Sequence, residues 1–158
     1  MILANARGVS QCTFTPLGLF EQKLLEQEDC VDIQAAAILA EAVNQVNAYL
    51  HGQLKEFDLP IDWSGITPFS KSVYEASMKI PYGEVRAYGE LAAAIGNPGA
   101  ARAVGQALGA NPIALIVPCH RIIGQDGHLH GFSAPDGLKT KAWLLQLEGH
   151  QVVENRLL

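Results

Sequence analysis

The sequence predicts an α+β protein with two parts: a small N-terminal α/β lobe, residues 1–62, and a mostly helical C-terminal lobe, residues 63–158. Three observations support this prediction. Apolar and polar side chains alternate over residues 8–14, as in a half-buried strand. An alanine-rich stretch over 34–50 has helical spacing, and several short helical segments follow residue 67. The chain is 49% hydrophobic and 17% charged, which suits a folded protein with a sizeable core.

Local signals place the boundaries of the first elements. The segment 21–32 is acidic and is predicted to be a solvated surface. After the first helix, the sequence FDLPIDWSGI, residues 57–66, contains a proline and a glycine and predicts a linker. Thr67 is then placed to cap a second amphipathic helix over 68–80, which opens with proline.

Two short helices, residues 87–95 and 100–109, are predicted on either side of a tight turn. This arrangement is typical of a helix-turn-helix DNA-binding motif, and equally of a plain helical hairpin. The apolar run over 113–117 predicts a buried strand. A last helix is expected over 137–148, because a glycine follows it as a C-terminal cap.

Charge is unevenly distributed along the chain, which has a net charge of −5. Acidic residues outnumber basic ones two to one before residue 81, whereas residues 81–125 carry a slight basic excess. A DNA-binding face would lie in this middle block, with a modest dependence on salt. The absence of a signal peptide or an apolar run long enough to span a membrane favours a cytoplasmic protein with no membrane partner. An odd count of three cysteines argues against a disulfide scaffold.

Cys119 is the candidate nucleophile, because it follows the apolar run and precedes a histidine. A thiol reacts as its thiolate, and an imidazole held by a carboxylate can take the proton. His120 is the candidate base, and Glu148, at the end of the last helix, could orient it. Arg121 would add positive charge near the thiol, and Asn111 would add a turn with an amide. From these residues alone, an inert buried thiol is the alternative.

Three stretches of sequence carry a family resemblance: IPYGEVRAYGELAAAIGNPGAA, then RAVGQALGANPIALIVPCHRIIG, then GFS with KAWLLQLEG. Together they closely resemble the O6-alkylguanine-DNA alkyltransferases, or methylated-DNA–protein-cysteine methyltransferases. The resemblance is dense from Phe69 to Gly149 and weaker over 38–60. It implies a ribonuclease-H-like N-terminal lobe. Because the family usually has a strand before the one that GVSQCTF resembles, we expect that preceding strand to be missing or replaced here.

The resemblance implies direct DNA repair without a cofactor. An alkyl group, normally methyl, would pass from O6-alkylguanine, and also from O4-alkylthymine, in double-stranded DNA to Cys119. The transfer would be irreversible, so a monomeric protein would act once per molecule. His120 would act as base through a water, Glu148 would orient His120, and Asn111 would brace the turn. Tyr88 would promote rotation of the nucleotide and donate a proton to the departing guanine.

The resemblance also implies how DNA is held. The helix-turn-helix would enter the minor groove, where Ala101 lacks the bulk to prevent a close approach. Arg102 would fill the gap left by the extruded base. Asn97, opening the second helix, would contact phosphate. The pocket for the extruded base would be lined by Val117, Ile122, Phe132 and Ser133.

Other functions fit the sequence less well. An alkyltransferase-like protein that binds lesions without repairing them usually has tryptophan in place of the nucleophile. A helix-turn-helix regulator would have a more basic recognition helix. A cysteine hydrolase would need a substrate cleft that nothing in the sequence suggests. We predict no metal, because neither set of candidate ligands has a familiar zinc spacing. Those sets are Cys119, His120, His128 and His130, and Cys12, Cys30 and His51.

Overall fold

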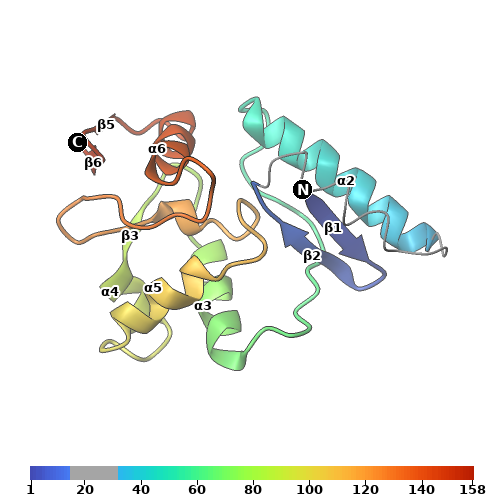
Figure 1. Ribbon diagram of the computed structural model, residues 1–158, viewed down its shortest axis with the longest axis horizontal. Helices are drawn as coiled ribbons and strands as arrows, with labels where there is room; N and C mark the ends of the chain where they lie inside the picture. Colours follow the sequence, from blue (N-terminus) through green and yellow to red (C-terminus); the bar gives the residue numbers. More distant parts are fainter. Residues whose placement is uncertain (15–31) are drawn as a thin grey trace.

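The computed structural model describes residues 1–14 and 32–158. It combines helices with small sheets, which confirms the predicted mixture of α and β elements. One group of elements contains β1, Ile2–Asn5, β2, Gly8–Cys12, and α2, Ile33–Leu50, and it lies beside a mostly helical group (Figure 1). The predicted acidic surface, apart from its last residue, lies outside the described residues.

The helical group follows the predicted order, with element ends shifted by one or two residues. The Thr67 side chain accepts a hydrogen bond from the Ser70 backbone N–H at 3.2 Å, which confirms the predicted cap. The elements are α3, Pro68–Met78; β3, Arg86–Ala87; α4, Tyr88–Ala94; α5, Ala101–Gly109; the 3-10 turn η2, Cys119–Arg121; β4, Ile122–Ile123; α6, Leu138–Leu147; β5, Val152–Val153; and β6, Arg156–Leu157. β3 pairs in parallel with β4, and β5 pairs antiparallel with β6.

A strand does precede the predicted N-terminal strand, which corrects the expectation that it is missing or replaced. β1 pairs antiparallel with β2, with Ile2 opposite Cys12 and Asn5 opposite Gly8. The predicted strand 8–14 ends at Cys12, and Thr13 bonds back to the Met1 carbonyl. The residues Met1–Ala4 are uniformly apolar, so no alternation reveals a strand there from the sequence.

The hairpin is fastened to the linker by its own backbone. The Val9 N–H donates to the Pro60 carbonyl at 2.8 Å, and the Asp62 N–H donates to the Val9 carbonyl at 3.0 Å. Gly8 makes this close approach possible: it has a φ of 149°, and a Cβ placed there would lie 2.5 Å from the Pro60 oxygen. The position therefore requires glycine for both its backbone angle and its space.

Gly8→Ala is expected to lower the free energy of unfolding by about 1–3 kcal/mol, because the added methyl must push the hairpin away from the linker. Chemical denaturation measures this change. Gly52→Ala is the matched control, since Gly52 also has a positive φ, 69°, but no atom lies within 4 Å of its Cβ position. Equal losses of unfolding free energy in the two variants would show that backbone strain, and not the close contact with Pro60, explains the requirement for glycine at position 8.

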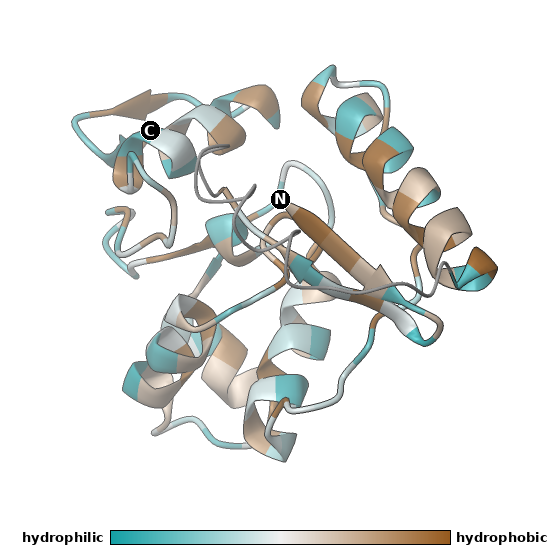
Figure 2. Cartoon of the chain, turned by 45° about the vertical axis from the view of Figure 1, so that its right-hand side comes forward, coloured by the Kyte–Doolittle hydropathy of each residue, from teal (hydrophilic) through white to brown (hydrophobic). Residues whose placement is uncertain are grey.

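Helix α2 carries one tyrosine into the interior. Its N-cap is Asp32, whose side chain accepts from the backbone N–H groups of Gln34 and Ala35, and it ends at Leu50 as predicted. Apolar residues recur along it (Figure 2), and the helix packs on β1 and β2. Tyr49, in its last turn, is completely buried. The N-terminal group thus places a hydroxyl inside the molecule.

The apolar run 113–117 is buried, but the prediction of a strand there is wrong. Its residues form a tight turn: the Val117 N–H donates to the Ile113 carbonyl at 2.9 Å, and Leu115 has a φ of 76°. Only isolated bridges remain, one of them joining Ile113 to Cys12. A short apolar run indicates that a segment is buried, but it does not determine the backbone conformation of that segment. The turn brings the chain to Cys119.

The main core is shared by both groups of elements. Its buried residues include Val9 and Ala42 from the N-terminal group and Val73, Val104 and Val117 from the rest of the chain. Because both groups contribute to one core, the division into two lobes between residues 62 and 63 stays a prediction. Among the described residues, no helix combines the length and the apolar character needed to cross a membrane.

Candidate active site

Cys119 lies at the start of η2, where Asn111 braces the turn. The thiol is 8% exposed, and the Asn111 side-chain amide Nδ2 lies 3.5 Å from its Sγ. The same Nδ2 donates to the Val117 carbonyl at 3.1 Å, while Asn111 Oδ1 accepts from the Ile113 N–H at 2.9 Å. Asn111 therefore ties both ends of the turn together and offers a donor to the sulfur.

The environment of Cys119 favours the protonated thiol. Burial raises its pKa, and the Asn111 amide, the charge of Lys141 and the backbone N–H groups of Cys119 and His120 only partly oppose this. These opposing contacts all favour the thiolate. Formation of the nucleophile therefore needs a base, and the site is built to hold the anion once it forms.

His120 and Arg121 both bind Glu148 inside the protein. His120 Nε2 lies 2.9 Å from Glu148 Oε1, and both side chains are completely buried. Arg121 donates from its Nε at 3.1 Å to each carboxylate oxygen, and from Nη2 at 2.9 Å. The sequence suggested that Arg121 adds charge near the thiol; its charge is instead matched by Glu148, because a buried guanidinium needs a carboxylate.

The hydrogen bonds define which nitrogen of His120 is free. Burial opposes ionisation of Glu148, but the bonds from His120 and Arg121 outweigh it and hold the carboxyl pKa below its ordinary value. The ionised carboxylate can only accept, so His120 Nε2 carries a proton. Burial lowers the pKa of His120, which keeps the ring neutral. Its Nδ1 is then an unprotonated acceptor, and no described residue bonds to it.

Two residues that the sequence analysis missed complete the buried polar set. Tyr49 donates its hydroxyl to Glu148 Oε1 at 2.6 Å and lies 3.2 Å from His120 Nε2. Burial raises its pKa, so it remains a donor. No local pattern marks Tyr49 as different from other core aromatics. Lys141 did carry a signal: it falls on the apolar stripe of α6, with Leu138 three residues before it and Leu144 three after.

A cavity of 510 Å³ opens beside the sulfur. It brings together Cys119 with Tyr88, Arg102 and Ala101 from α4 and α5 and with Phe132 and Ser133 from the loop after β4. The Ser133 hydroxyl donates to the Gly109 carbonyl at 2.6 Å. The remaining lining residues are Gly105, Leu108, Gly109, His130 and Gly131. Half of the predicted site residues line the cavity, and the nucleophile is one of them.

Three predicted contact residues lie elsewhere. Val117 and Ile122 are completely buried and do not line the cavity. Asn97 does not open α5, which begins at Ala101; it lies exposed in the turn after α4, where its carbonyl accepts from the Ala100 N–H at 2.9 Å. The proline and glycine that follow Asn97 delay the helix start. The contacts assigned to these residues stay predictions.

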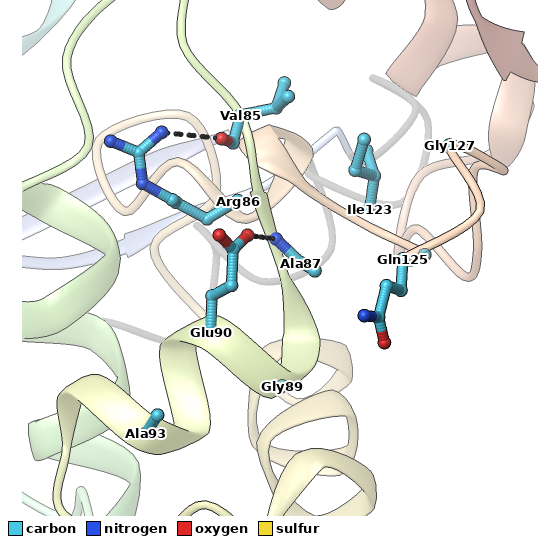
Figure 3. Close-up of a pocket in the computed structure, with 10 residues that line it drawn as sticks. Val85, Arg86, Ala87, Gly89, Glu90, Ala93, Ile123, Gln125 and Gly127 are labelled. Atoms are coloured by element: carbon cyan, nitrogen blue, oxygen red, sulfur yellow. Dashed lines mark hydrogen bonds between the residues drawn. The ribbon is translucent and has the colours of Figure 1, made fainter.

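A second cavity, of 540 Å³, lies between β3, the start of α4 and the loop after β4 (Figure 3). In it the Glu90 carboxylate accepts the Ala87 N–H at 2.6 Å, which caps α4. Arg86 pairs with Glu84 at 2.8 Å. None of the predicted site residues lines this cavity. The chemistry therefore points to the cavity that holds Cys119.

Candidate metal ligands do not gather into one cluster in the part of the chain that the structure describes. In residues 1–14 and 32–158, no group of three or more His, Cys, Asp or Glu side chains is arranged to hold a metal ion. His128 pairs with Asp126 at 2.9 Å. Burial raises the pKa of Cys12 to about 11, which disfavours the thiolate that a metal needs. Cys30 lies outside the described residues.

Two family models match the sequence. Residues 68–150 match the DNA-binding domain of 6-O-methylguanine DNA methyltransferase, and residues 17–63 match its ribonuclease-like domain. The first match alone covers more than half of the chain. The chain belongs to the 6-O-methylguanine DNA methyltransferase family. The resemblance inferred from the sequence is thereby confirmed.

Individual relatives agree with this assignment. A methylated-DNA–protein-cysteine methyltransferase of Mycobacterium leprae is 54% identical over 114 residues, which are 72% of this chain and 67% of the relative. The structure of Mycobacterium tuberculosis OGT in complex with DNA has a TM-score of 0.66 at 54% identity, covering 70% of this chain and 66% of that one. This chain thus spans about two thirds of the length of these mycobacterial relatives.

A more distant structure covers more of the chain. The O6-methylguanine-DNA methyltransferase of Pyrococcus kodakaraensis is 25% identical with a TM-score of 0.61, covering 93% of this chain and 89% of that one. The similarity therefore extends beyond the helical group to the N-terminal elements. The family model of the ribonuclease-like domain, residues 17–63, includes Tyr49, which reaches the buried carboxylate.

Proposed function

We propose that this protein repairs DNA by moving an alkyl group, normally methyl, from O6-alkylguanine in double-stranded DNA to Cys119. The single observation that carries the proposal is the position of Cys119 at the wall of a cavity, one residue from a neutral histidine held by Glu148. The family supports it, since the Mycobacterium leprae relative is named as a methyltransferase acting on methylated DNA and a protein cysteine. O4-alkylthymine is a further substrate of the same chemistry.

The transfer is a displacement at the alkyl carbon. The Cys119 proton passes through a water to His120 Nδ1, the acceptor that no described residue occupies. The thiolate attacks the carbon, the S–C bond forms, and the C–O6 bond breaks with its electron pair on guanine. Tyr88, which lines the cavity, donates a proton to the departing base and regains one from His120 through water. The thioether product has no route back to the thiol, so each molecule of the methyltransferase acts once.

The geometry also suggests how DNA is bound. α4, the turn after it and α5 act as the helix-turn-helix, with α5 against the minor groove. Arg102 is exposed at the cavity edge, where it can replace an extruded base in the stack. Ala101 and Gly105 keep this edge of α5 free of bulk. Asn97, exposed in the turn, contacts phosphate.

The extruded guanine enters the cavity between Tyr88 and Phe132. Phe132 packs on the base with its ring face, and Ser133 donates to the O6 atom. The Ser133 hydroxyl is already used on Gly109, so this donation requires the hydroxyl to turn or the backbone N–H to serve. Carbonyls of the turn at 117–119 read the other edge of the base, with Val117 and Ile122 supporting the turn from the core.

The protein is proposed to act as a monomer in the cytoplasm, with neither cofactor nor metal. Its chemistry needs a reduced cysteine, which a reducing compartment maintains. Cys12 and Cys119 are both free thiols. The lobe that precedes the linker is proposed to be ribonuclease-H-like.

Intact-mass spectrometry tests the function. The protein is incubated with excess duplex carrying one O6-methylguanine, and with the matching unmodified duplex as control. The expected result is one added CH₂, located on the Cys119 peptide, that stops at one per protein molecule. Selective binding of the modified duplex without any mass gain would identify a non-repairing lesion binder. Neither gain nor selectivity would reject the proposal.

A further inference from the structure

The C-terminal hairpin, residues 151–158, folds against a loop that lines both large cavities. It follows the part of the chain that the DNA-binding family model matches, and it is built from β5 and β6. Arg156 of β6 forms an antiparallel bridge with His128 in the loop after β4. We call residues 124–131 the glycine loop, because three of its eight residues are glycine. The hairpin thus adds a strand to the edge of the glycine loop.

Hydrogen bonds from the hairpin hold the middle of the glycine loop. Two backbone bonds flank the bridge: the Leu129 N–H donates to the Asn155 carbonyl at 2.7 Å, and the Leu157 N–H donates to the Gly127 carbonyl at 3.0 Å. The Arg156 Nε also donates to the Asp126 carbonyl at 3.2 Å. Among the residues that the structure describes, no other element forms a hydrogen bond or ion pair with residues 125–129. The hairpin is therefore the main polar anchor of this part of the loop.

Apolar packing adds to these bonds. Val152 and Leu157 of the hairpin pack against a cluster formed by Ile123, Leu129 and Leu145, and Leu129 is 3% exposed. A loop with three glycines has many accessible backbone conformations, because glycine lacks a Cβ. Ordering such a loop needs contacts from outside it. The position of the glycine loop therefore depends on the hairpin.

The glycine loop contributes to the walls of both cavities. Its residues divide between them: Gly124, Gln125 and Gly127 line the second cavity (Figure 3), whereas His130 and Gly131 line the cavity of Cys119. The start of α4 divides in the same way, since Tyr88 lines the cavity of Cys119 and its neighbours Ala87 and Gly89 line the other. Tyr88 meets the loop at His130: the ring centres are 6.3 Å apart, and the Tyr88 hydroxyl donates to the His130 carbonyl at 3.4 Å. That carbonyl also accepts from the Lys141 Nζ at 2.9 Å. The contact between Tyr88 and His130 thus separates the two cavities.

This arrangement bears on the size of the alkyl group. The reacting carbon must lie against the Cys119 sulfur, so the rest of a larger group needs the space around it. A released glycine loop can move away from Tyr88, and the cavity of Cys119 then opens toward the second cavity of 540 Å³. We propose that the C-terminal hairpin determines specificity: by holding the glycine loop against Tyr88, it restricts the protein to small alkyl groups. The proposal rests on the function proposed above.

The first test weakens the contacts of the hairpin in the full chain. Leu157→Ala removes an apolar anchor, and Arg156→Ala removes the side-chain bond to the loop without touching the core. Val153→Ala is the matched control, since Val153 is 53% exposed on the same hairpin. Hydrogen exchange of the peptide 124–131 is followed by mass spectrometry without DNA. Single-turnover transfer is then measured for two duplexes that differ only in carrying O6-benzylguanine or O6-methylguanine. Thermal unfolding checks that each variant is folded.

In Leu157→Ala, the loop peptide is expected to exchange about tenfold faster, and the ratio of benzyl to methyl transfer rates should rise about tenfold. Arg156→Ala should show smaller rises in both quantities, and Val153→Ala should keep the wild-type values. A loss of stability alone slows both substrates alike and leaves their ratio unchanged. Unchanged loop exchange, or an unchanged transfer ratio, in folded Leu157→Ala and Arg156→Ala would overturn the proposal.

A second test restores the anchor. The two backbone bonds flank His128 and Arg156, which makes them a non-hydrogen-bonded pair, and the Cα atoms of such a pair are close enough for a disulfide. His128→Cys with Arg156→Cys is therefore added to Leu157→Ala, and peptide mass checks that Cys119 stays a free thiol. Oxidation is expected to return loop exchange and the transfer ratio to the wild-type values. A ratio that stays high in the oxidised protein would overturn the proposal.

The two proposals can fail separately. A wild type that accepts neither alkyl group would reject the proposed function. Loop exchange does not depend on repair, and the ratio of the affinities for the two duplexes would then replace the ratio of transfer rates. An affinity ratio that is the same in the wild type and in Leu157→Ala would overturn the role of the hairpin as well.

Discussion

Replacing Cys119 with serine is expected to reduce methyl transfer by about a thousandfold or more, because a hydroxyl in this environment does not ionise as a thiol does. Burial already raises the pKa of the thiol, and it disfavours an alkoxide still more. The volume change is small, and Asn111 can still donate to the new oxygen. The fold and the affinity for the modified duplex should therefore be retained.

Single-turnover transfer from labelled O6-methylguanine duplex measures the loss, and a binding titration with the same duplex measures the affinity. Cys12→Ala is the control, since Cys12 is a second buried thiol that lies outside the cavity. It should transfer methyl at the wild-type rate while losing some stability. Transfer by Cys119→Ser at a rate near that of the wild type would reject Cys119 as the acceptor.

Glu148→Ala is expected to lower the free energy of unfolding by about 3–5 kcal/mol, because it leaves the buried Arg121 guanidinium unmatched. The carboxylate also accepts from His120, from Tyr49 and from the Gly83 N–H at 3.1 Å. His120 would lose the bond that fixes its tautomer, so methyl transfer should fall as well. Chemical denaturation and single-turnover transfer measure the two effects.

The contribution of Glu148 to stability depends on pH in a definite direction. Its carboxyl pKa is lowered by folding from the ordinary value of 4.5. The added stability is therefore full above that value and is lost as the pH falls below it. Glu148→Ala should remove this acid-dependent part. Glu75→Ala, at an exposed position on α3, should change stability by no more than about 0.5 kcal/mol. Similar losses in the two variants would contradict the buried network.

Much of the helical group could be predicted because its signals are local. Thr67 caps α3 with its own side chain, and glycine ends α6: the Gly149 N–H bonds the Gln146 carbonyl and the His150 N–H bonds the Leu145 carbonyl, each at 3.0 Å. Gly149 has the positive φ, 96°, that this ending requires. The family motif added Cys119 and the residues around its cavity, which local patterns left undecided.

The features that could not be predicted depend on distant contacts. The turn at 113–117 is bridged to Cys12, far away in the sequence, and an apolar run alone does not reveal that contact. Tyr49 is 99 residues from Glu148, so its role depends on how the two groups of elements pack. Lys141 was visible as a charge on an apolar stripe, but its carbonyl partners came only with the folded loop.

Tyr49 and Glu148 lie in different groups of elements, so the hydrogen bond between them forms only when both groups have folded and docked. The reactive site around Cys119 is therefore complete only in the fully folded protein. A molecule whose helical half has formed, but whose N-terminal hairpin and α2 have not docked, leaves the carboxylate open to solvent at the place that Tyr49 covers. Closing so long a loop is entropically costly, so this contact exists only when the two groups of elements have docked. Partly folded molecules would thus carry the Cys119 thiol beside a His120 whose carboxylate partner is not yet fully bonded. In this way, a cysteine that can accept only one alkyl group is kept from reacting before the protein has folded completely.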